Sequence, residues 1–390
     1  MKRVYLDNAA TTNVSQDVLN EMIPAFNVVY GNSNSIHSFG REAINLVDRA
    51  RDKVAKAIGA KSNEIYFTSG GTEANNWAIK GIAHANKDKG KHIIVSKIEH
   101  DSVLESCKSL EEEGFEVTYL NVDSNGLVSL ADLMHEIRRD TILISIMAVN
   151  NEVGTIQNVK AIAKTAHENG IIFHTDAVQA VGSIKIDVND MEIDVMSMSA
   201  HKIYGPKGVG ALYIKNGIKC KNLIDGGTQE RGLRGGTVNV PAVVGFGKAI
   251  EVAVRDIIVN QQKIKTIRDY FVRQINARIP YIRVNGHQYQ KVQGILNVGF
   301  EMVDSEALVT MLDLEGIAVS VGSACMSGVA QKSHVLTAMK VPEEYSKGSI
   351  RFSFGRNISK EDIDYTLDKL VEVVSRLRAI SAVTKTGRAK

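Results

Sequence analysis

The sequence predicts an α/β protein built on a mostly parallel sheet, followed by a smaller α+β part. Between residues 64 and 214, short apolar runs alternate with helical segments, which is typical of βαβ units. A long helical pattern over 240–277 ends this alternation, and short strand patterns follow it. At 390 residues the chain is long enough for two domains. We expect a larger domain at 15–260, and a smaller one formed by 1–14 together with 261–390.

The elements of the larger domain are predicted from hydrophobic spacing. Helical stripes over 15–28 and 41–58 indicate helices near the start of the chain. Beyond them, apolar runs bounded by turn formers indicate strands, mostly with helical segments between them. We expect strands at 65–68, 92–96, 117–120, 141–149, 171–175 and 195–199, and a further apolar run stands at 211–214.

The smaller domain is predicted from the region that follows the long helix. Strand patterns there are shorter and are not separated by regular helical segments, which favours an α+β arrangement. The strand candidates are 281–284, 295–298 and 349–354, and a last helical pattern covers 360–378.

Composition and charge restrict the functional class. The net charge of +3 is too small to indicate nucleic-acid binding, and the longest apolar run, 142–149, is too short to cross a membrane. The first residues contain no apolar signal-peptide core. The three cysteines, Cys107, Cys220 and Cys325, are unrelated in spacing, which argues against a disulfide framework. We therefore expect a soluble, cytoplasmic protein that binds neither membranes nor nucleic acid directly.

One lysine stands in an unusual setting. Lys202 follows the period-2 run 195–199 and precedes a loop rich in glycine, and Ser199 and His201 stand close to it in the sequence. A surface lysine needs no such surroundings. A lysine that forms a Schiff base beside a bound phosphate does need them.

Polar clusters also follow other predicted strands, at the sheet edge where ligands of such folds bind. The stretch 69–73 joins two glycines to a helix start, which suits an anion, although a turn capped by Thr72 is the simpler explanation when it is taken alone. The stretch 99–102 contains His100, for which a catalytic and a structural role both fit. The stretch 150–154 is either a turn or a ligand contact.

An acidic residue at the end of another strand favours a pyridine cofactor. Asp176 follows the apolar strand 171–175, where a carboxylate is costly unless it is paired. A protonated pyridine nitrogen would supply that pairing, whereas a helix N-cap is the alternative. Because Lys202 ends the next strand and an anion-type loop lies upstream, the cofactor is the better interpretation.

Two residues near the C-terminal strands have settings that suit chemistry. Cys325 lies among Gly, Ser and Ala, whereas Cys107 falls in a helical pattern and Cys220 between lysines. Only Cys325 therefore suits a nucleophilic thiolate, with a small residue in a turn as the alternative. Arg351 lies inside an alternating strand pattern, where its planar fork suits a carboxylate. The alternative is a surface salt bridge, which fits Arg356 better than Arg351.

Together these residues resemble the class V aminotransferase-like family and, within it, the cysteine desulfurases of the NifS/IscS kind. The most specific match is Ser-Ala-His-Lys at 199–202 combined with Gly-Ser-Ala-Cys at 322–325. One departure is Ser33, which stands where the family usually has proline. The matching segments follow the family's order along nearly the whole chain: 5–12, 68–73, 99–100, 149–152, 176–179, 199–208, 231–237, 322–325 and 349–353.

The resemblance implies a fold-type-I enzyme that depends on pyridoxal 5′-phosphate, with a seven-stranded type of sheet, and a homodimer with sites at the subunit interface. By matching position, Lys202 would carry the cofactor, Asp176 would pair with its ring nitrogen, and Gln179 with its phenolic oxygen. His100 would stack on the ring and move protons. The remaining roles would fall to Gly71, Thr72, Ser199 and His201 at the phosphate, to Thr237 from the partner subunit, and to Asn151 and Arg351 at the substrate carboxylate, with Asn151 also near the cofactor.

The activity that the resemblance implies is the conversion of L-cysteine to L-alanine, with the sulfur left as a persulfide on Cys325. The acceptor of that sulfur is either a tRNA-thiolating enzyme or an iron–sulfur scaffold protein. Alternatives are a selenocysteine lyase or a class V aminotransferase with the same cofactor, or a sulfur-carrier subunit without catalysis. Cys325 argues against a pure aminotransferase, and the set Lys202, Asp176 and His100 argues against the carrier.

Overall fold

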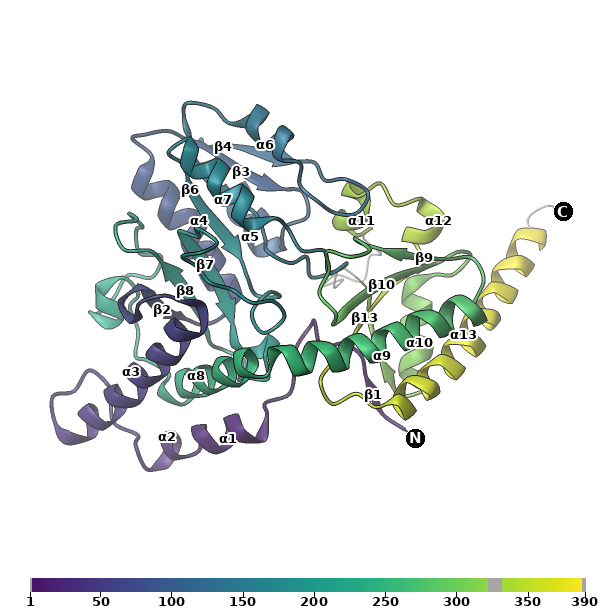
Figure 1. Cartoon of the computed structure of the whole chain (residues 1–390), viewed down its shortest axis with the longest axis horizontal. Coiled ribbons are helices and arrows are strands. Elements are labelled where there is room, and N and C mark those ends of the chain that lie inside the picture. Colours follow the sequence, from purple (N-terminus) through teal and green to yellow (C-terminus); the bar gives the residue numbers. More distant parts are fainter. Residues whose placement is uncertain (1, 322–331, 388–390) are drawn as a thin grey trace.

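The computed structural model describes residues 2–321 and 332–387, so that Cys325 lies outside the described residues. Two separate sheets organise these residues. A seven-stranded sheet occupies one part of the molecule, and a four-stranded sheet occupies the other (Figure 1).

The seven-stranded sheet is mostly parallel, as the sequence predicts. Its strand order is β2-β8-β7-β6-β5-β3-β4, and only β8 is antiparallel to its neighbours. The carboxyl ends of the other six strands therefore meet at one edge. The strands are β2 (Ile65–Thr68), β3 (His92–Ser96), β4 (Glu116–Leu120), β5 (Thr141–Ser145), β6 (Ile172–Asp176), β7 (Val195–Ser199) and β8 (Gly210–Ile214).

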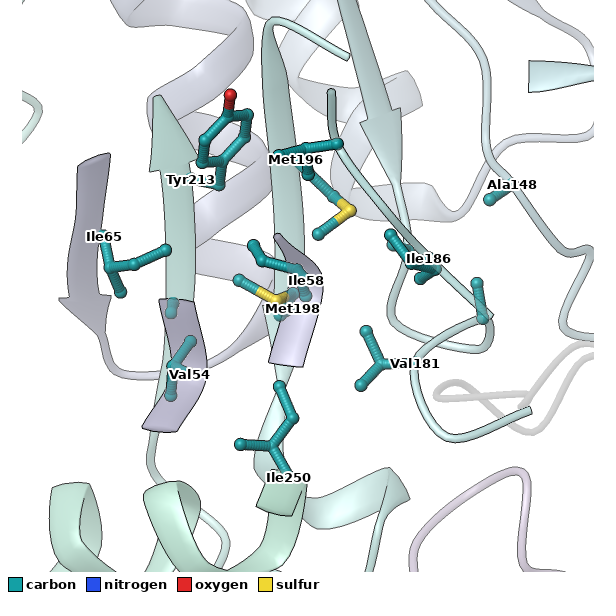
Figure 2. Packing of buried hydrophobic residues seen from close by; sticks show 14 of the residues in the cluster. Val54, Ile58, Ile65, Ala148, Val181, Ile186, Met196, Met198, Tyr213 and Ile250 are labelled. Atoms are coloured by element: carbon teal, nitrogen blue, oxygen red, sulfur yellow. The ribbon is translucent and has the colours of Figure 1, made fainter. Parts of the chain in front are cut away.

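Helices cover both faces of this sheet, which is why its central strands are apolar on both sides. On β7, Met196 and Met198 belong to the apolar cluster of one face, and Val195 to that of the other. Figure 2 shows both methionines on the side of the sheet where Ile58 and Ile250 pack. The first face carries α3 (Ser38–Ile58), α7 (Val159–Glu168) and α8 (Val240–Arg255), and the second carries α4 (Gly71–Asn86) and α5 (Asp101–Glu112).

The four-stranded sheet is antiparallel, in the order β12-β13-β10-β9, and has its own apolar cluster. The start of the chain joins this part, because β1 (Val4–Tyr5) pairs with β11 (Ile317–Ala318) and Leu6 is buried in the same cluster. The strands are β9 (Ile282–Asn285), β10 (Ile295–Phe300), β12 (Ser320–Val321) and β13 (Ser349–Ser353), and the packed helices are α9 (Ile257–Arg278), α10 (Ser305–Leu314) and α13 (Lys360–Gly387).

Short helices complete the described chain. The segment α11 (His334–Ala338) contributes Val335 and Leu336 to a small cluster with Met147, close to the edge of the large sheet. The others are α6 (Leu130–Glu136), α12 (Glu343–Ser346), α1 (Gln16–Met22) and α2 (Pro24–Asn27). Within the described residues, no helix has both the length and the apolar character that crossing a bilayer requires.

Several predicted elements differ from the structure in their bounds or their continuity. The helix predicted at 15–28 is divided into α1 and α2, and Pro24 stands at the first position of α2, where its missing N–H is tolerated. The long helix predicted at 240–277 is likewise two helices, α8 and α9, which part at Asp256. The strand predicted at 141–149 ends at Ser145. Ile146 and Ala148 still donate to carbonyl oxygens of β6, but the Met147 N–H donates to the Glu99 carboxyl group, and pairing with β3 stops.

Candidate active site

A cavity of about 610 Å³ lies at the carboxyl ends of the large sheet's central strands and is closed on one side by β13 of the small sheet. Thr237 lies elsewhere, in a smaller hollow beside Ser69 and Arg234. The cavity brings together ten of the residues that the sequence singles out: Gly71, Thr72, His100, Asn151, Asp176, Gln179, Ser199, His201, Lys202 and Arg351.

Lys202 is held against the start of the chain. It ends a short 3₁₀ turn that directly follows β7, and its Nζ donates to the carbonyl oxygens of Ala9 (2.6 Å) and Ala10 (2.8 Å). Burial lowers the pKa of Lys202 to about 8, and the positive charge of Arg351 acts in the same direction. The neutral, nucleophilic form of this amine is therefore much more populated near neutral pH than that of an exposed lysine.

Asp176 ends β6 and is 5% exposed. Its Oδ1 accepts a hydrogen bond from the Val178 backbone N–H (2.8 Å), and its Oδ2 accepts one from Asn75 Nδ2 (2.7 Å). The residues after it form a turn, so Asp176 caps no helix. A buried carboxylate that faces the cavity with two neutral donors behind it is suited to pair with a cation such as a pyridinium.

His100 stands at the N-cap of α5 and lines the cavity from the side of β3. Its Nδ1 accepts a hydrogen bond from the Ser102 backbone N–H (3.1 Å) and lies 2.9 Å from Ser102 Oγ. The residue remains exposed, so its ring is open to the cavity. An imidazole fixed through one nitrogen can present the other to a ligand.

The other end of the cavity suits a phosphate. Helix α4 begins at Gly71, and its first backbone N–H groups carry the positive end of the helix dipole. Ser199 Oγ is buried without a hydrogen-bond partner among the described residues, and a phosphate oxygen would supply one. Burial, aided by Lys202, lowers the pKa of His201 to about 4, so His201 is a neutral ligand. Together with Lys202 and Asp176, this donor set fits pyridoxal 5′-phosphate.

Arg351 brings a cation from the small sheet to the opposite side of the cavity. It is 5% exposed, and it donates from Nη1 to the backbone oxygen of Asn151 (2.9 Å) and from Nη2 to Asp7 Oδ1 (3.1 Å). Its Nε is buried without a partner among the described residues. This donor is available to a substrate carboxylate.

Arg356, Cys107 and Cys220 are not among the residues that line this cavity. Arg356 does not form the surface salt bridge favoured for it among the described residues; its guanidinium lies over the Tyr204 ring, 4.0 Å from the centroid. Cys107 is fully buried, as its helical pattern predicts, and burial raises the pKa of its thiol. Cys220 is only partly exposed, and its Sγ lies 3.8 Å from the Trp77 backbone oxygen.

Sequence reasoning missed several polar residues of the site. Asn75 connects Asp176 to Ser102, and Glu152 accepts a hydrogen bond from Ser333 Oγ (2.6 Å) beside the cavity. Burial raises the pKa of Glu152. A signal for Asn75 exists in the sequence, because it occupies a position in the buried stripe of α4. A polar residue at such a position needs a buried partner.

Comparison with known proteins identifies the family. The sequence model of the aminotransferase class-V family matches residues 4–366. Cysteine desulfurase IscS of Dictyoglomus turgidum is 52% identical over 382 residues, which are 98% of this chain and 97% of that protein. A solved NifS-like protein matches with a TM-score of 0.91 and 40% identity over 96% of this chain and 100% of its own. SspA, solved in complex with cysteine, matches with a TM-score of 0.80 and 38% identity over 90% of this chain and 99% of its own. The chain therefore belongs to the class V aminotransferase family and, within it, to the pyridoxal-phosphate-dependent cysteine desulfurases.

Proposed function

We propose that this chain takes the sulfur of L-cysteine onto Cys325 as a persulfide and releases L-alanine, and that the residues of the cavity have the roles given below. The observation that carries these roles is that Lys202, Asp176 and His100 from the large sheet meet Arg351 from the small sheet around one cavity. A similar protein, SspA, binds cysteine. Pyridoxal phosphate, when bound, draws electrons away from the α-carbon of an amino acid.

At the ring end of the cavity, Lys202 would hold the cofactor through its amine. The same amine would move the proton at the α-carbon of the substrate. Asp176 holds a positive charge at the ring nitrogen, because its carboxylate is buried and already oriented by Asn75. His100 would lie against the cofactor and move protons, and Gln179 would hold its phenolic oxygen; both line the cavity.

At the substrate end, Arg351 and Asn151 bind the carboxylate of cysteine. Arg351 has one buried donor free, Nε, and shares another with Asp7. Fixing the carboxylate orients the side chain of the substrate, so that its sulfur can meet a thiolate. The Cys325 thiolate attacks that sulfur, the Cβ–S bond breaks with its electron pair remaining on Cβ, and a proton completes the methyl group of alanine.

At the phosphate end, Gly71, Thr72, Ser199 and His201 hold the phosphate. Thr237 lies outside this cavity, and we assign it to the site of a partner subunit in a homodimer. The segment before it is fixed to the phosphate loop, because Arg234 donates to both carboxylate oxygens of Glu73 (2.9 and 3.0 Å). This ion pair supports the chain close to Thr237, which lines a hollow together with Ser69 and Arg234.

The division into a larger domain, 15–260, and a smaller one, 1–14 with 261–390, also remains a proposal. Its support is that Val4 and Leu6 are buried in the apolar cluster of the small sheet, together with Ile264. We further propose a cytoplasmic location. The acceptor of the persulfide sulfur is a tRNA-thiolating enzyme or an iron–sulfur scaffold protein, and transfer of labelled sulfur to each purified candidate decides between them.

Two variants test the assignment of the nucleophile and of the Schiff-base lysine. Cys325→Ala should retain bound cofactor, seen in the visible spectrum, but should lose both alanine formation and the mass gain of one sulfur atom. Lys202→Ala should lose turnover together with covalent cofactor. Normal desulfuration by Cys325→Ala would show that another group takes the sulfur, and selenocysteine offered beside cysteine measures the preference between the two substrates.

A further inference from the structure

Asn75 joins two residues of the proposed site from behind. It lies on α4 and is 1% exposed. Its Nδ2 lies 2.7 Å from Asp176 Oδ2 and 2.8 Å from Ser102 Oγ, so both amide protons are used. Its Oδ1 is buried without a hydrogen-bond partner among the described residues. The amide thus acts only as a donor.

The carboxylate of Asp176 determines how this amide is oriented. A flipped amide would place Oδ1 of Asn75 against Oδ2 of Asp176, and two acceptors at that distance repel each other. An amide that leaves its own oxygen unpaired in a buried place is costly. The donation to Asp176 and Ser102 outweighs that cost, which points to a functional constraint on this position.

The orientation of Asn75 in turn directs the hydroxyl proton of Ser102. Because Ser102 Oγ accepts from Asn75, its own proton is free for His100 Nδ1, which lies 2.9 Å away. The Ser102 backbone N–H donates to the same nitrogen. A nitrogen that accepts two donors must carry a lone pair, so the proton of the neutral imidazole is on Nε2.

We propose that Asn75 is a positioning residue that orients the Asp176 carboxylate and, through Ser102, keeps the proton of His100 on Nε2. This inference rests on the proposed roles of Asp176 and His100. One amide then orients the Asp176 carboxylate, which we assign to the ring nitrogen, and fixes the position of the proton on His100. Asn75 lines the cavity, but both of its amide protons are used by Asp176 and Ser102, so we expect it to act on kcat more than on substrate binding.

The variants Asn75→Asp and Asn76→Asp form a matched test, since they add the same charge at adjacent positions of α4. Asn76 is partly exposed and donates only to the Thr72 backbone oxygen of its own helix turn. Asn75→Asp places an acceptor against both Asp176 and Ser102, so that the Ser102 hydroxyl turns away from His100. We expect it to lower kcat by roughly 10- to 100-fold with KM for cysteine within about twofold, whereas Asn76→Asp leaves both nearly unchanged.

Two further readouts separate a positioning role from a purely structural one. The visible spectrum of the loaded protein should change its pH dependence in Asn75→Asp and Asn75→Ala but not in Asn76→Asp. In the protein without cofactor, the ¹⁵N signals of His100 should show the Nε2–H form in the wild type and a different chemical shift at Nδ1 in Asn75→Asp. The His100 signals test the contacts from Asn75 through Ser102 to His100 even in a protein without desulfurase activity. Failure of the proposed function can therefore be told apart from failure of this inference.

A double-mutant cycle tests whether the contacts form one unit. If Asn75 acts on His100 through Ser102, the variant Asn75→Ala with Ser102→Ala should lose less kcat than the sum of the two single effects. Additive losses would remove the Ser102 step from the proposal. A fall in melting temperature with unchanged kcat, spectrum and His100 signals would show that Asn75 is a structural residue. That result would overturn the proposal.

Discussion

Arg351 Nη2 lies 3.1 Å from Asp7 Oδ1, so the guanidinium that we assign to the substrate carboxylate already has an acidic neighbour. The pair joins β13 of the small sheet to the start of the chain. On this assignment, Asp7 and the carboxylate of cysteine would share the same cation. A charged competitor beside a binding arginine weakens the binding of an anionic group and keeps the arginine oriented when the site is empty.

Removing the charge of Asp7 should strengthen substrate binding. Asp7→Asn keeps an oxygen near Arg351 but no longer competes electrostatically, so we expect KM for cysteine to fall by roughly 2- to 10-fold. Arg351→Lys should raise KM by roughly 10-fold or more, since it loses the planar fork. Initial rates of alanine formation over a range of cysteine concentrations measure both. An unchanged or higher KM in Asp7→Asn would show that the pair serves orientation alone.

Cofactor loading should depend on pH through Lys202. Only the neutral amine attacks a carbonyl, and burial sets the pKa of Lys202 at about 8, so the rate at which the cofactor-free protein takes up pyridoxal phosphate should rise through that pH. Arg351→Met removes a positive charge that lowers this pKa and should move the midpoint to higher pH. Arg356→Met is the matched control and should leave the pH midpoint unchanged. Absorbance during reconstitution at a series of pH values gives the midpoints.

Much of the fold follows from the sequence alone, because apolar runs bounded by turn residues define most strands of the large sheet. The strands predicted at 65–68, 92–96 and 195–199 have those bounds in the structure. The division between α8 and α9 at Asp256 could not be predicted, since the helical stripe runs through it and no proline or glycine marks the position.

The cavity was also predictable in outline, because polar residues that follow parallel strands must meet at one sheet edge. Contacts across the chain were not predictable. Asn75 and Asp176 are far apart in sequence, and only the packing of α4 on β6 brings them together. Arg351 likewise contacts the backbone of Asn151 instead of its side chain, which no residue pattern indicates.

The buried carboxyl group of Glu99 should make stability depend on pH. Burial, with a smaller contribution from the charge of Asp176, raises the pKa of Glu99 to about 8 from 4.5. The folded state then binds a proton that the unfolded state has released, so the free energy of unfolding should fall as pH rises from about 4.5 to about 8. Glu99→Gln should flatten this fall, and Glu112→Gln, exposed on the following helix, should not. Urea unfolding at several pH values measures this dependence. If the free energy of unfolding changes with pH in the same way in the wild type and both variants, the dependence arises from a group other than Glu99.

The ion pair of Arg51 and Glu230 should be important for folding, because both residues are buried. Two hydrogen bonds of 2.7 Å join them, and Glu230 also accepts from the Phe67 backbone N–H. Glu230→Ala leaves a buried guanidinium without its carboxylate, which we expect to lower the free energy of unfolding by about 3–5 kcal/mol.

An exposed ion pair provides the control for this loss. Glu113 contacts His84 on the surface, and Glu113→Ala should cost less than about 1 kcal/mol. Replacing both members of the buried pair, Arg51→Met with Glu230→Leu, should recover much of the stability lost in Glu230→Ala, since no unpaired charge remains. Denaturant unfolding of the four proteins measures these differences. If the double variant is no more stable than Glu230→Ala, the loss arises from the backbone contact of Glu230 with Phe67 and not from the unpaired charge.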